Sequence, residues 1–373
     1  MGFREDYRGL MCRLGRFRTS DEFEIQKTVA SIDTLLRRAD DLYRGAIPVH
    51  TDGIDIDNLM RRATNHLEAL ERGEYPLAGR FTEPGVAFVD HSFIEHEGVM
   101  HVFYNRSWIG YDWPERYTDT IGHATSTDLI HWQIHTPVIA VTPDDFGTYQ
   151  VWSPAVFRHE DRFYMIYTGV NEHIAQAPCL AVSQDLFHFT KHTGNPVFIP
   201  GSWSDWEPGK WSNCRDSFVT RDGDTLYQYM FVSRRTEAGT MEPAIGIASS
   251  QDAIHWQEVL TFSLPSCNTA AESPFVIQHR EKWYFFYTNC GNGTAYAIGD
   301  SPLGPWTEQA ILFAPRLTST DAAHVPSCAE VFEFKGKWYI SVCERLPGWE
   351  QYLEIYELFW ESDGTVRIGQ LLK

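Results

Sequence analysis

The feature that most constrains the fold of this chain is a unit that recurs five times after residue 80. Each copy opens on a short apolar strand, in the order FVDHSFIEH, VWSPAVFRH, CRDSFVTRD, AESPFVIQH and PSCAEVFEF, and a tight turn then leads to an aromatic strand. In four copies a third strand of small residues follows. Aligning the opening strands places Asp90, Ser153, Asp216, Glu272 and approximately Ser327 at equivalent head positions, spaced 63, 63, 56 and 55 residues apart.

Five units of this length, with four strands each, predict an all-β fold, a five-bladed β-propeller over residues 81–373. A β-sandwich of similar strand count is the alternative, which the regularity of the repeat disfavours. Residues 1–80 predict an N-terminal α-helical extension, with a capped helix start at Thr19 to Glu22 and a second helix over Ile56–Glu71. We expect this amphipathic segment to pack outside the propeller or to form a homo-oligomer.

Charge and cysteine usage exclude several classes of function. The net charge of −19 lies almost wholly after residue 80, and such a field repels nucleic acid and anionic membranes, which leaves a neutral small molecule as the natural partner. Seven cysteines without a CxxC pair argue against a disulfide framework and a zinc site. The charged N-terminus shows no secretory signal and no apolar run suits a membrane span, so we expect a cytoplasmic location.

Acidic head positions indicate the chemistry. In a propeller the first residues of the inner strands meet around one axis, so Asp90, Asp216 and Glu272 are expected in one funnel. Two carboxyl groups that flank a sugar, one protonated and one ionised, cleave glycosidic bonds. Arg215 is expected to keep Asp216 ionised and to bind the sugar, whereas apolar neighbours suit Glu272 to the role of general acid.

Further residues are candidates for substrate binding. Trp152 and Trp211, with Trp203 and Trp206 nearby, offer flat faces to a sugar ring, and strand packing is the alternative for each. Three more residues are expected near the axis, with a structural role as the alternative for the two histidines: Ser153, His91 and His324. The His-Trp and His-Phe pairs that repeat with the blades are interpreted as structural. No metal or cofactor is expected, although the axial channel has room for a structural calcium or sodium ion.

These motifs resemble the five-bladed-propeller glycoside hydrolases, the superfamily of families 32, 68, 43 and 62. The family-32 order is an Asp block, then RDP, then EC, and this chain has FVDHSF, CRDSFV and AESPFV in the same order. The resemblance implies that Asp90 is the nucleophile, Asp216 the transition-state stabiliser and Glu272 the acid/base. His-Ser-Phe after Asp90 and Ser-Pro after Glu272 are closer to family 43, whose members invert and use the first Asp as a base.

The resemblance therefore implies a glycosidase, either hydrolytic or transferring, for a small neutral furanoside such as a β-fructofuranoside or an arabinofuranoside. Arg215 before Asp216 favours the fructosidases and a retaining mechanism. An inverting arabinofuranosidase or xylosidase like those of family 43 is the first alternative. A non-catalytic sugar-binding propeller is the alternative from another class, and the intact set of three acids disfavours it.

Overall fold

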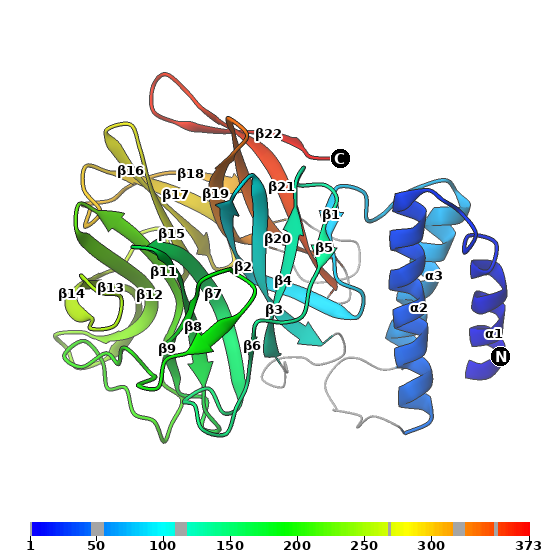
Figure 1. The fold of residues 1–373 in the computed structure, drawn as a ribbon, viewed down its shortest axis with the longest axis horizontal. Coiled ribbons are helices and arrows are strands. Elements are labelled where there is room, and N and C mark those ends of the chain that lie inside the picture. Colours follow the sequence, from blue (N-terminus) through cyan, green and yellow to red (C-terminus); the bar gives the residue numbers. More distant parts are fainter. Residues whose placement is uncertain (1, 46–55, 109–117, 268–269, 316–324, 347–349) are drawn as a thin grey trace.

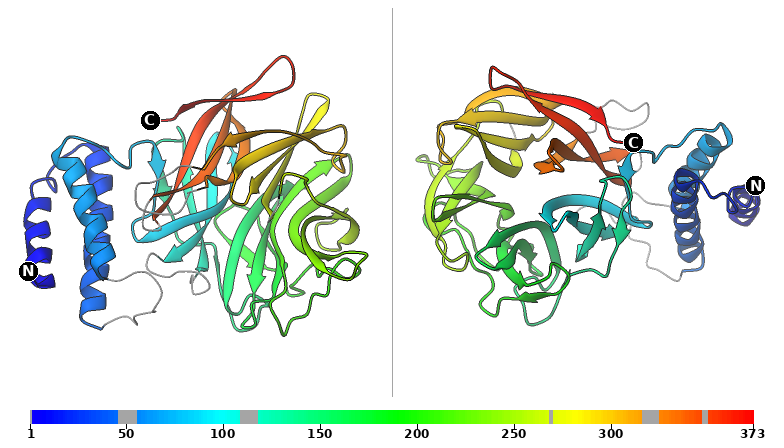
Figure 2. Two further views of the ribbon diagram at one scale, coloured as in Figure 1. Left: turned by 180° about the vertical axis from the view of Figure 1, so that it is seen from behind. Right: turned by 45° about the horizontal axis from the view of Figure 1, so that its top comes forward.

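Five antiparallel sheets surround a central axis in the computed structural model, which describes residues 2–45, 56–108, 118–267, 270–315, 325–346 and 350–373. The right view of Figure 2 shows this ring, and Figure 1 shows a group of three helices to one side of it. The inner strands β2, β7, β11, β15 and β19 contact one another in a closed cycle. The predicted five-bladed β-propeller with an N-terminal helical extension is confirmed.

Each blade has at least four strands, of which the first lies nearest the axis. The first two blades contain β2 (Val86–His96), β3 (Val99–Trp108), β4 (Thr118–Ser126), β5 (Gln133–Ile134) and β6 (Ile139–Ala140), then β7 (Gln150–His159), β8 (Arg162–Val170), β9 (Gln176–Ser183) and β10 (Phe189–Lys191). The third and fourth contain β11 (Cys214–Asp222), β12 (Thr225–Arg235), β13 (Met241–Ser250) and β14 (Gln257–Phe262), then β15 (Ala271–His279), β16 (Lys282–Asn289), β17 (Gly293–Gly299) and β18 (Thr307–Phe313). The fifth contains β19 (Ser327–Phe334), β20 (Lys337–Leu346), β21 (Glu350–Trp360) and β22 (Val366–Leu371), joined by β1 (Arg80–Phe81).

The helices are α1 (Phe3–Leu14), α2 (Phe23–Tyr43) and α3 (Ile56–Glu71), which share a core of their own. Leu14, Ile32, Leu36 and Leu67 are fully buried in it because apolar residues at helical spacing line one face of each helix. The predicted capping box does not form, since α2 begins without a side-chain cap and Ser20 Oγ instead accepts the N–H of Glu22, at 3.2 Å. Among the helices of the described residues, none combines the length and apolarity needed to cross a membrane.

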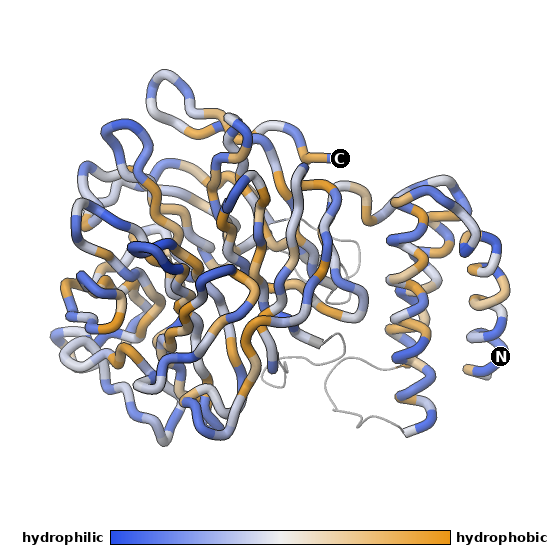
Figure 3. The backbone as a smooth tube through the Cα atoms, viewed as in Figure 1, coloured by the Kyte–Doolittle hydropathy of each residue, from blue (hydrophilic) through white to orange (hydrophobic). Residues whose placement is uncertain are grey.

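Aromatic side chains fill the spaces within and between the blades. Tyr104, Tyr167, Tyr229 and Phe285 are fully buried, each on the second strand of a blade, where large rings pack well between pleated surfaces. Figure 3 shows the corresponding apolar segments along the strands and hydrophilic residues along many of the connecting turns. Most of the aromatic excess therefore serves packing, and only a small part is left for a site.

A repeated turn after the third strand of three blades confirms the structural interpretation of the His-Trp and His-Phe pairs. In the first copy Asp128 Oδ1 accepts the N–H groups of Ile130 and His131, at 2.9 and 2.8 Å, and Asp128 Oδ2 lies 2.7 Å from His131 Nδ1. These bonds lower the pKa of Asp128 although partial burial opposes them. Asp185 and Asp252 make the same contacts in their blades.

The strand β1 closes the ring by pairing with β21, so a segment before the first blade completes the last one. Arg80 Nε donates to Glu354 Oε1 at 2.8 Å, and Glu354 is 1% exposed. Tyr356 also donates to Glu354, from its hydroxyl at 2.6 Å to Oε2. The Arg80–Glu354 ion pair fixes the link between the helical extension and the propeller.

We predict that Arg80→Met destabilises the protein by at least ~2 kcal/mol, because it removes the guanidinium group that pairs with the buried Glu354 carboxylate. The measurement is thermal unfolding followed by circular dichroism. The matched control is Arg72→Met, which removes an Arg from the exposed Arg72–Glu74 pair and should barely change the Tm. Equal effects of the two substitutions would contradict a structural role for the Arg80–Glu354 pair.

Candidate active site

A backbone irregularity at the same place in every inner strand defines the centre of the ring. Each of these strands breaks register with its partner there. At each break a non-glycine residue has a positive φ, and these residues are Asp90 (33°), Ser153 (47°), Asp216 (57°), Ser273 (48°) and Cys328 (57°). A left-handed backbone is unfavourable for such residues and persists only where the surroundings hold it.

This geometry corrects the alignment of the last two repeats. Ser273 and Cys328, not Glu272 and Ser327, occupy the head positions of the fourth and fifth blades. Glu272 lies one residue earlier, at the place that Arg215 has in the third blade. The sequence alignment matched Glu272 with Asp216 because both are acids. The residue at the backbone bulge marks the equivalent position instead, so the offset of one residue was not apparent.

Hydrogen bonds between neighbouring blades hold three of these head residues. Each donates its backbone N–H to a polar side chain near the end of the second strand of the preceding blade. The bonds are Ser153 N to Asn105 Oδ1 (2.7 Å), Asp216 N to Thr168 Oγ1 (3.2 Å) and Cys328 N to Thr288 Oγ1 (3.0 Å). These acceptors were not among the predicted residues, although Asn or Thr ends the aromatic motifs VFYN, MIYT and FFYT at equivalent places.

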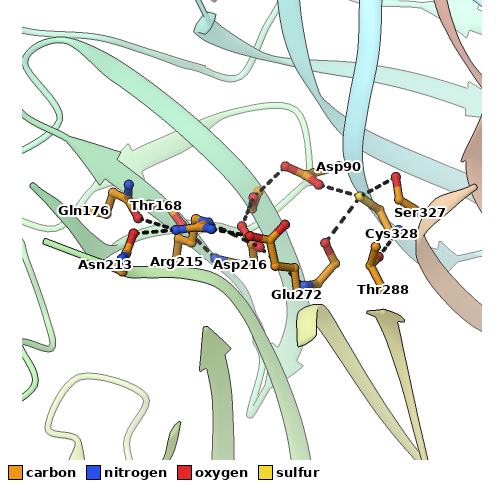
Figure 4. Close-up of polar contacts among 12 residues, drawn as sticks. Asp90, Thr168, Gln176, Asn213, Arg215, Asp216, Glu272, Thr288, Ser327 and Cys328 are labelled. Carbon is orange, nitrogen blue, oxygen red and sulfur yellow. Dashed lines mark hydrogen bonds and ion pairs between the residues drawn. The ribbon is translucent and has the colours of Figure 1, made fainter. Parts of the chain in front are cut away.

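The guanidinium group of Arg215 contacts both neighbouring acids. Its Nη2 donates to Glu272 Oε1, and its Nε lies 3.7 Å from Asp216 Oδ2. Two amide oxygens, of Gln176 at 3.1 Å and of Asn213 at 2.7 Å, orient it by accepting from Nη1. Figure 4 shows the guanidinium group between these amides and the two acids.

The closest ionic partner of Arg215 is therefore Glu272 and not Asp216, contrary to expectation. Asp216 is buried, and burial raises its pKa to about 7. Arg215 opposes this rise, while the nearby carboxyl groups of Asp90 and Glu272 add to it. The side chain of Glu272 is 30% exposed, so it is partly buried, as expected.

Asp90 accepts hydrogen bonds at both carboxyl oxygens. Asn105 Nδ2 and Ser153 Oγ lie 3.0 and 2.8 Å from Oδ2, and the thiol of Cys328 lies 2.7 Å from Oδ1. Figure 4 shows the contact between the carboxyl group of Asp90 and the sulfur of Cys328. The three donors fix the direction of this carboxyl group.

A cavity of about 450 Å³ opens above the ring of head residues. Six of the predicted residues line it: Asp90, Trp152, Trp211, Arg215, Asp216 and Glu272. The sequence analysis did not single out the other polar groups of its wall, which are Asn105, Ser107, Thr118, Ser273, Thr288, Cys328 and Gln351. The cavity thus combines carboxyl groups, one guanidinium group, neutral donors and two indole rings.

The two tryptophans of the cavity differ in exposure. Trp211 is 50% exposed, whereas Trp152 is 8% exposed and donates its indole N–H to Gln150 Oε1 at 3.0 Å. Gln351 Oε1 is buried without a hydrogen-bond partner among the described residues. It is an acceptor that a sugar hydroxyl would satisfy.

The remaining predicted residues lie outside this cavity. His91 is buried on the far side of the ring, 2.6 Å from Ser341 Oγ and 3.3 Å from Cys343 Sγ, and burial lowers its pKa to about 3. Ser153 lies between two carboxyl groups and lines a smaller axial cavity of about 30 Å³ together with His91. The expectation that these two residues contact the substrate does not fit their places in the fold.

Two other tryptophans and one histidine complete the account of the predicted residues. Trp203 and Trp206 pack against the core of the third blade. His324 lies outside the described residues. Within the described part of the chain, no group of three or more His, Cys, Asp or Glu side chains is arranged to hold a metal ion.

The structure is a five-bladed propeller with three carboxyl groups around one axial cavity, and the comparisons with known proteins assign it to the glycoside hydrolases. The Glycosyl hydrolases family 32 N-terminal domain model matches residues 90–301, more than half of the chain. The protein belongs to this family of the five-bladed-propeller glycoside hydrolases.

Similar proteins include both a xylosidase/arabinosidase and beta-fructofuranosidases. A xylosidase/arabinosidase of Bacteroides ovatus is 32% identical over 330 residues, which cover 77% of this chain and 96% of that protein. A vacuolar acid beta-fructofuranosidase of a Rosa hybrid cultivar is 34% identical over 111 residues, but the match spans only 28% of this chain and 17% of that protein. The short match to the plant enzyme therefore carries much less of the fold than the bacterial one.

Solved structures share the fold at low identity. A thermostable family-43 glycoside hydrolase superposes with a TM-score of 0.62 at 20% identity, over 78% of this chain and 94% of that one. A Bombyx mori family-32 beta-fructofuranosidase superposes with a TM-score of 0.60 at 18% identity, over 79% of this chain and 65% of that one. Both support the propeller architecture.

We predict that Asp216→Asn stabilises the protein progressively as the pH rises from about 4 to about 7. The raised pKa of Asp216 means that the folded protein holds a proton that the unfolded chain releases, so the wild type loses stability over this range and the Asn variant does not. Above pH 7 the gain should be at least ~1 kcal/mol. Urea unfolding at several pH values measures it.

The matched control is Asp224→Asn, in an exposed turn, which should change stability equally at all these pH values. A difference between Asp216→Asn and wild type that does not depend on pH would contradict the buried, protonated state of Asp216.

Proposed function

We propose that the protein hydrolyses a small neutral furanoside, such as a β-fructofuranoside or an arabinofuranoside, with Asp90 as nucleophile and Glu272 as acid/base. The observation that carries the proposal is the convergence of Asp90, Asp216, Glu272 and Arg215 on one cavity. The volume of about 450 Å³ lies within the range of small-molecule pockets. Such a volume favours a small glycoside or a chain end over the middle of a polymer.

Each carboxyl group has a distinct role in this proposal. Asp90, held by three donors, attacks the anomeric carbon. Glu272 protonates the leaving oxygen and later activates the water that completes hydrolysis. Asp216, which lines the cavity, bonds sugar hydroxyls.

Arg215 links substrate binding to the protonation of Glu272. In the free protein Arg215 pairs with Glu272, whereas a general acid has to carry a proton. We propose that sugar hydroxyls draw the guanidinium group away, after which Glu272 takes up its proton beside the glycosidic oxygen. Trp211, half exposed, covers one face of the sugar.

A second candidate is an inverting xylosidase or arabinofuranosidase, in which Asp90 activates water instead of attacking the sugar. The Bacteroides ovatus relative, named a xylosidase/arabinosidase, favours it because the match extends over 77% of this chain. Arg215 before Asp216, as in the RDP block of the fructosidases, supports retention, and we keep retention as the leading proposal. Transfer to a second sugar is a variant of the retaining route, and added acceptor sugars would reveal it.

The configuration of the first product distinguishes the two mechanisms. A panel of aryl fructo-, arabino- and xylosides identifies a substrate that is turned over. We expect proton NMR early in its hydrolysis to show a first sugar product with the same anomeric configuration as the substrate. A first product of opposite configuration would make Asp90 the base that activates water. Absence of turnover across the whole panel would contradict the proposed substrate class.

Glu272→Gln should remove nearly all activity on substrates with poor leaving groups, by at least ~100-fold in kcat/KM, because no proton reaches the departing oxygen. Aryl glycosides with activated leaving groups need little protonation and should retain more of their rate. Steady-state kinetics on both kinds of substrate measure the difference. Equal losses on the two would contradict the general-acid role of Glu272.

A further inference from the structure

Ser153 bridges two of the three carboxyl groups with one hydroxyl. Its Oγ lies 2.8 Å from Asp90 Oδ2 and 2.9 Å from Asp216 Oδ1. Both separations are hydrogen-bond distances, and each such contact between oxygens requires a proton. A serine hydroxyl supplies only one, so the second proton has to come from a carboxyl group.

The neighbours of Asp90 indicate which carboxyl group holds that proton. The amide of Asn105 is oriented because its Oδ1 accepts the N–H of Ser153, at 2.7 Å, and its Nδ2 then donates to Asp90 Oδ2. With Cys328 on Oδ1, Asp90 already faces donors at both oxygens. At Asp216, Oδ2 accepts the N–H of Ser273 at 3.3 Å, whereas Oδ1 faces the Ser153 hydroxyl, and the proton therefore fits on Oδ1 of Asp216.

The charge balance of the cavity supports this placement. Of the described residues that line it, Arg215 alone carries a positive charge, against the three carboxyl groups of Asp90, Asp216 and Glu272. Arg215 already pairs with Glu272. Burial and the two other acids both favour a neutral Asp216.

We propose that Ser153 is a positioning residue that makes Asp90 and Asp216 one proton-sharing unit, in which Asp216 donates to Ser153 and Ser153 donates to Asp90. The proposal rests on the proposed function only for its consequence in catalysis. The bridge keeps Asp216 neutral and leaves the negative charge on Asp90, the residue that is to act at the anomeric carbon. Nothing is transferred in this resting arrangement, since each proton stays on its own oxygen.

The test compares Ser153→Gly with the matched control Ser273→Gly. Both serines have a positive φ, near 47° and 48°, where glycine is unstrained, but the Ser273 hydroxyl contacts Cys328 at 3.4 Å instead of joining two carboxyl groups. The readout is the ¹³C titration of the aspartate carboxyl carbons by NMR, with Asp216→Asn used to assign the resonances. This readout does not depend on activity.

In Ser153→Gly the neutral form of Asp216 loses its acceptor and the anionic form of Asp90 loses a donor. We expect the apparent pKa of Asp216 to fall and that of Asp90 to rise, so that the two approach each other by ~1 unit or more, while Ser273→Gly keeps the wild-type separation. Ser153→Ala, which keeps the Cβ, should give the same result. An unchanged separation in both Ser153 variants would overturn the proposal.

The pH profile of kcat/KM supplies the second readout. In Ser153→Gly the acidic limb, which reports the ionisation of Asp90 as nucleophile, should move to higher pH, whereas a merely structural effect would lower the rate without moving this limb. If the pKa values of Asp90 and Asp216 approach each other in Ser153→Gly but the wild-type protein has no glycosidase turnover, the result supports the bridge and contradicts the proposed function. If Ser153→Gly has normal turnover, a wild-type pH profile and an unchanged separation of the two pKa values, the result contradicts the bridge alone.

Discussion

The structure depends on a backbone bend that recurs at the start of each inner strand. The bend places a non-glycine residue at positive φ in each blade, and in three of them a hydrogen bond from the preceding blade holds that residue. Asn105, Thr168 and Thr288 are therefore as much a part of the site as the acids. Because the bends lie in a closed cycle of strands, side chains far apart in sequence come within hydrogen-bond distance of one another.

The three carboxyl groups of the site lie in different electrostatic environments. Asp90 lies among donors, Asp216 is buried beside two other acids, and Glu272 pairs with Arg215. Environments that push carboxyl groups toward different protonation states are the general means by which one site supplies acid, base and nucleophile. Burial of Asp216 is the main cause that favours one protonated carboxyl group, and among the described residues that line the cavity only Arg215 brings a positive charge against three acids.

Much of this arrangement followed from the sequence, because a repeat fixes topology and topology fixes which residues meet. The propeller and the approach of Asp90 to Asp216 came from the repeat, and the helical extension came from the helical spacing of apolar residues before it. The register of the last two blades did not follow, since a bulge leaves no compositional mark and the more conspicuous Glu272 hid Ser273. The closest partner of Arg215 could not be predicted from the sequence either. Arg215 is next to Asp216 in the chain, but its closer contact is with Glu272 of the neighbouring blade.

The most direct test of the account is chemical rescue of Asp90→Gly, which removes the carboxyl group while glycine retains the positive φ of 33°. If Asp90 acts at the anomeric carbon, this variant should lose nearly all turnover of an activated aryl furanoside, and azide should restore it and appear in the product as a glycosyl azide of inverted configuration. A variant that keeps turnover in the absence of azide, or that azide does not affect, would contradict the assignment of Asp90 to the reacting centre.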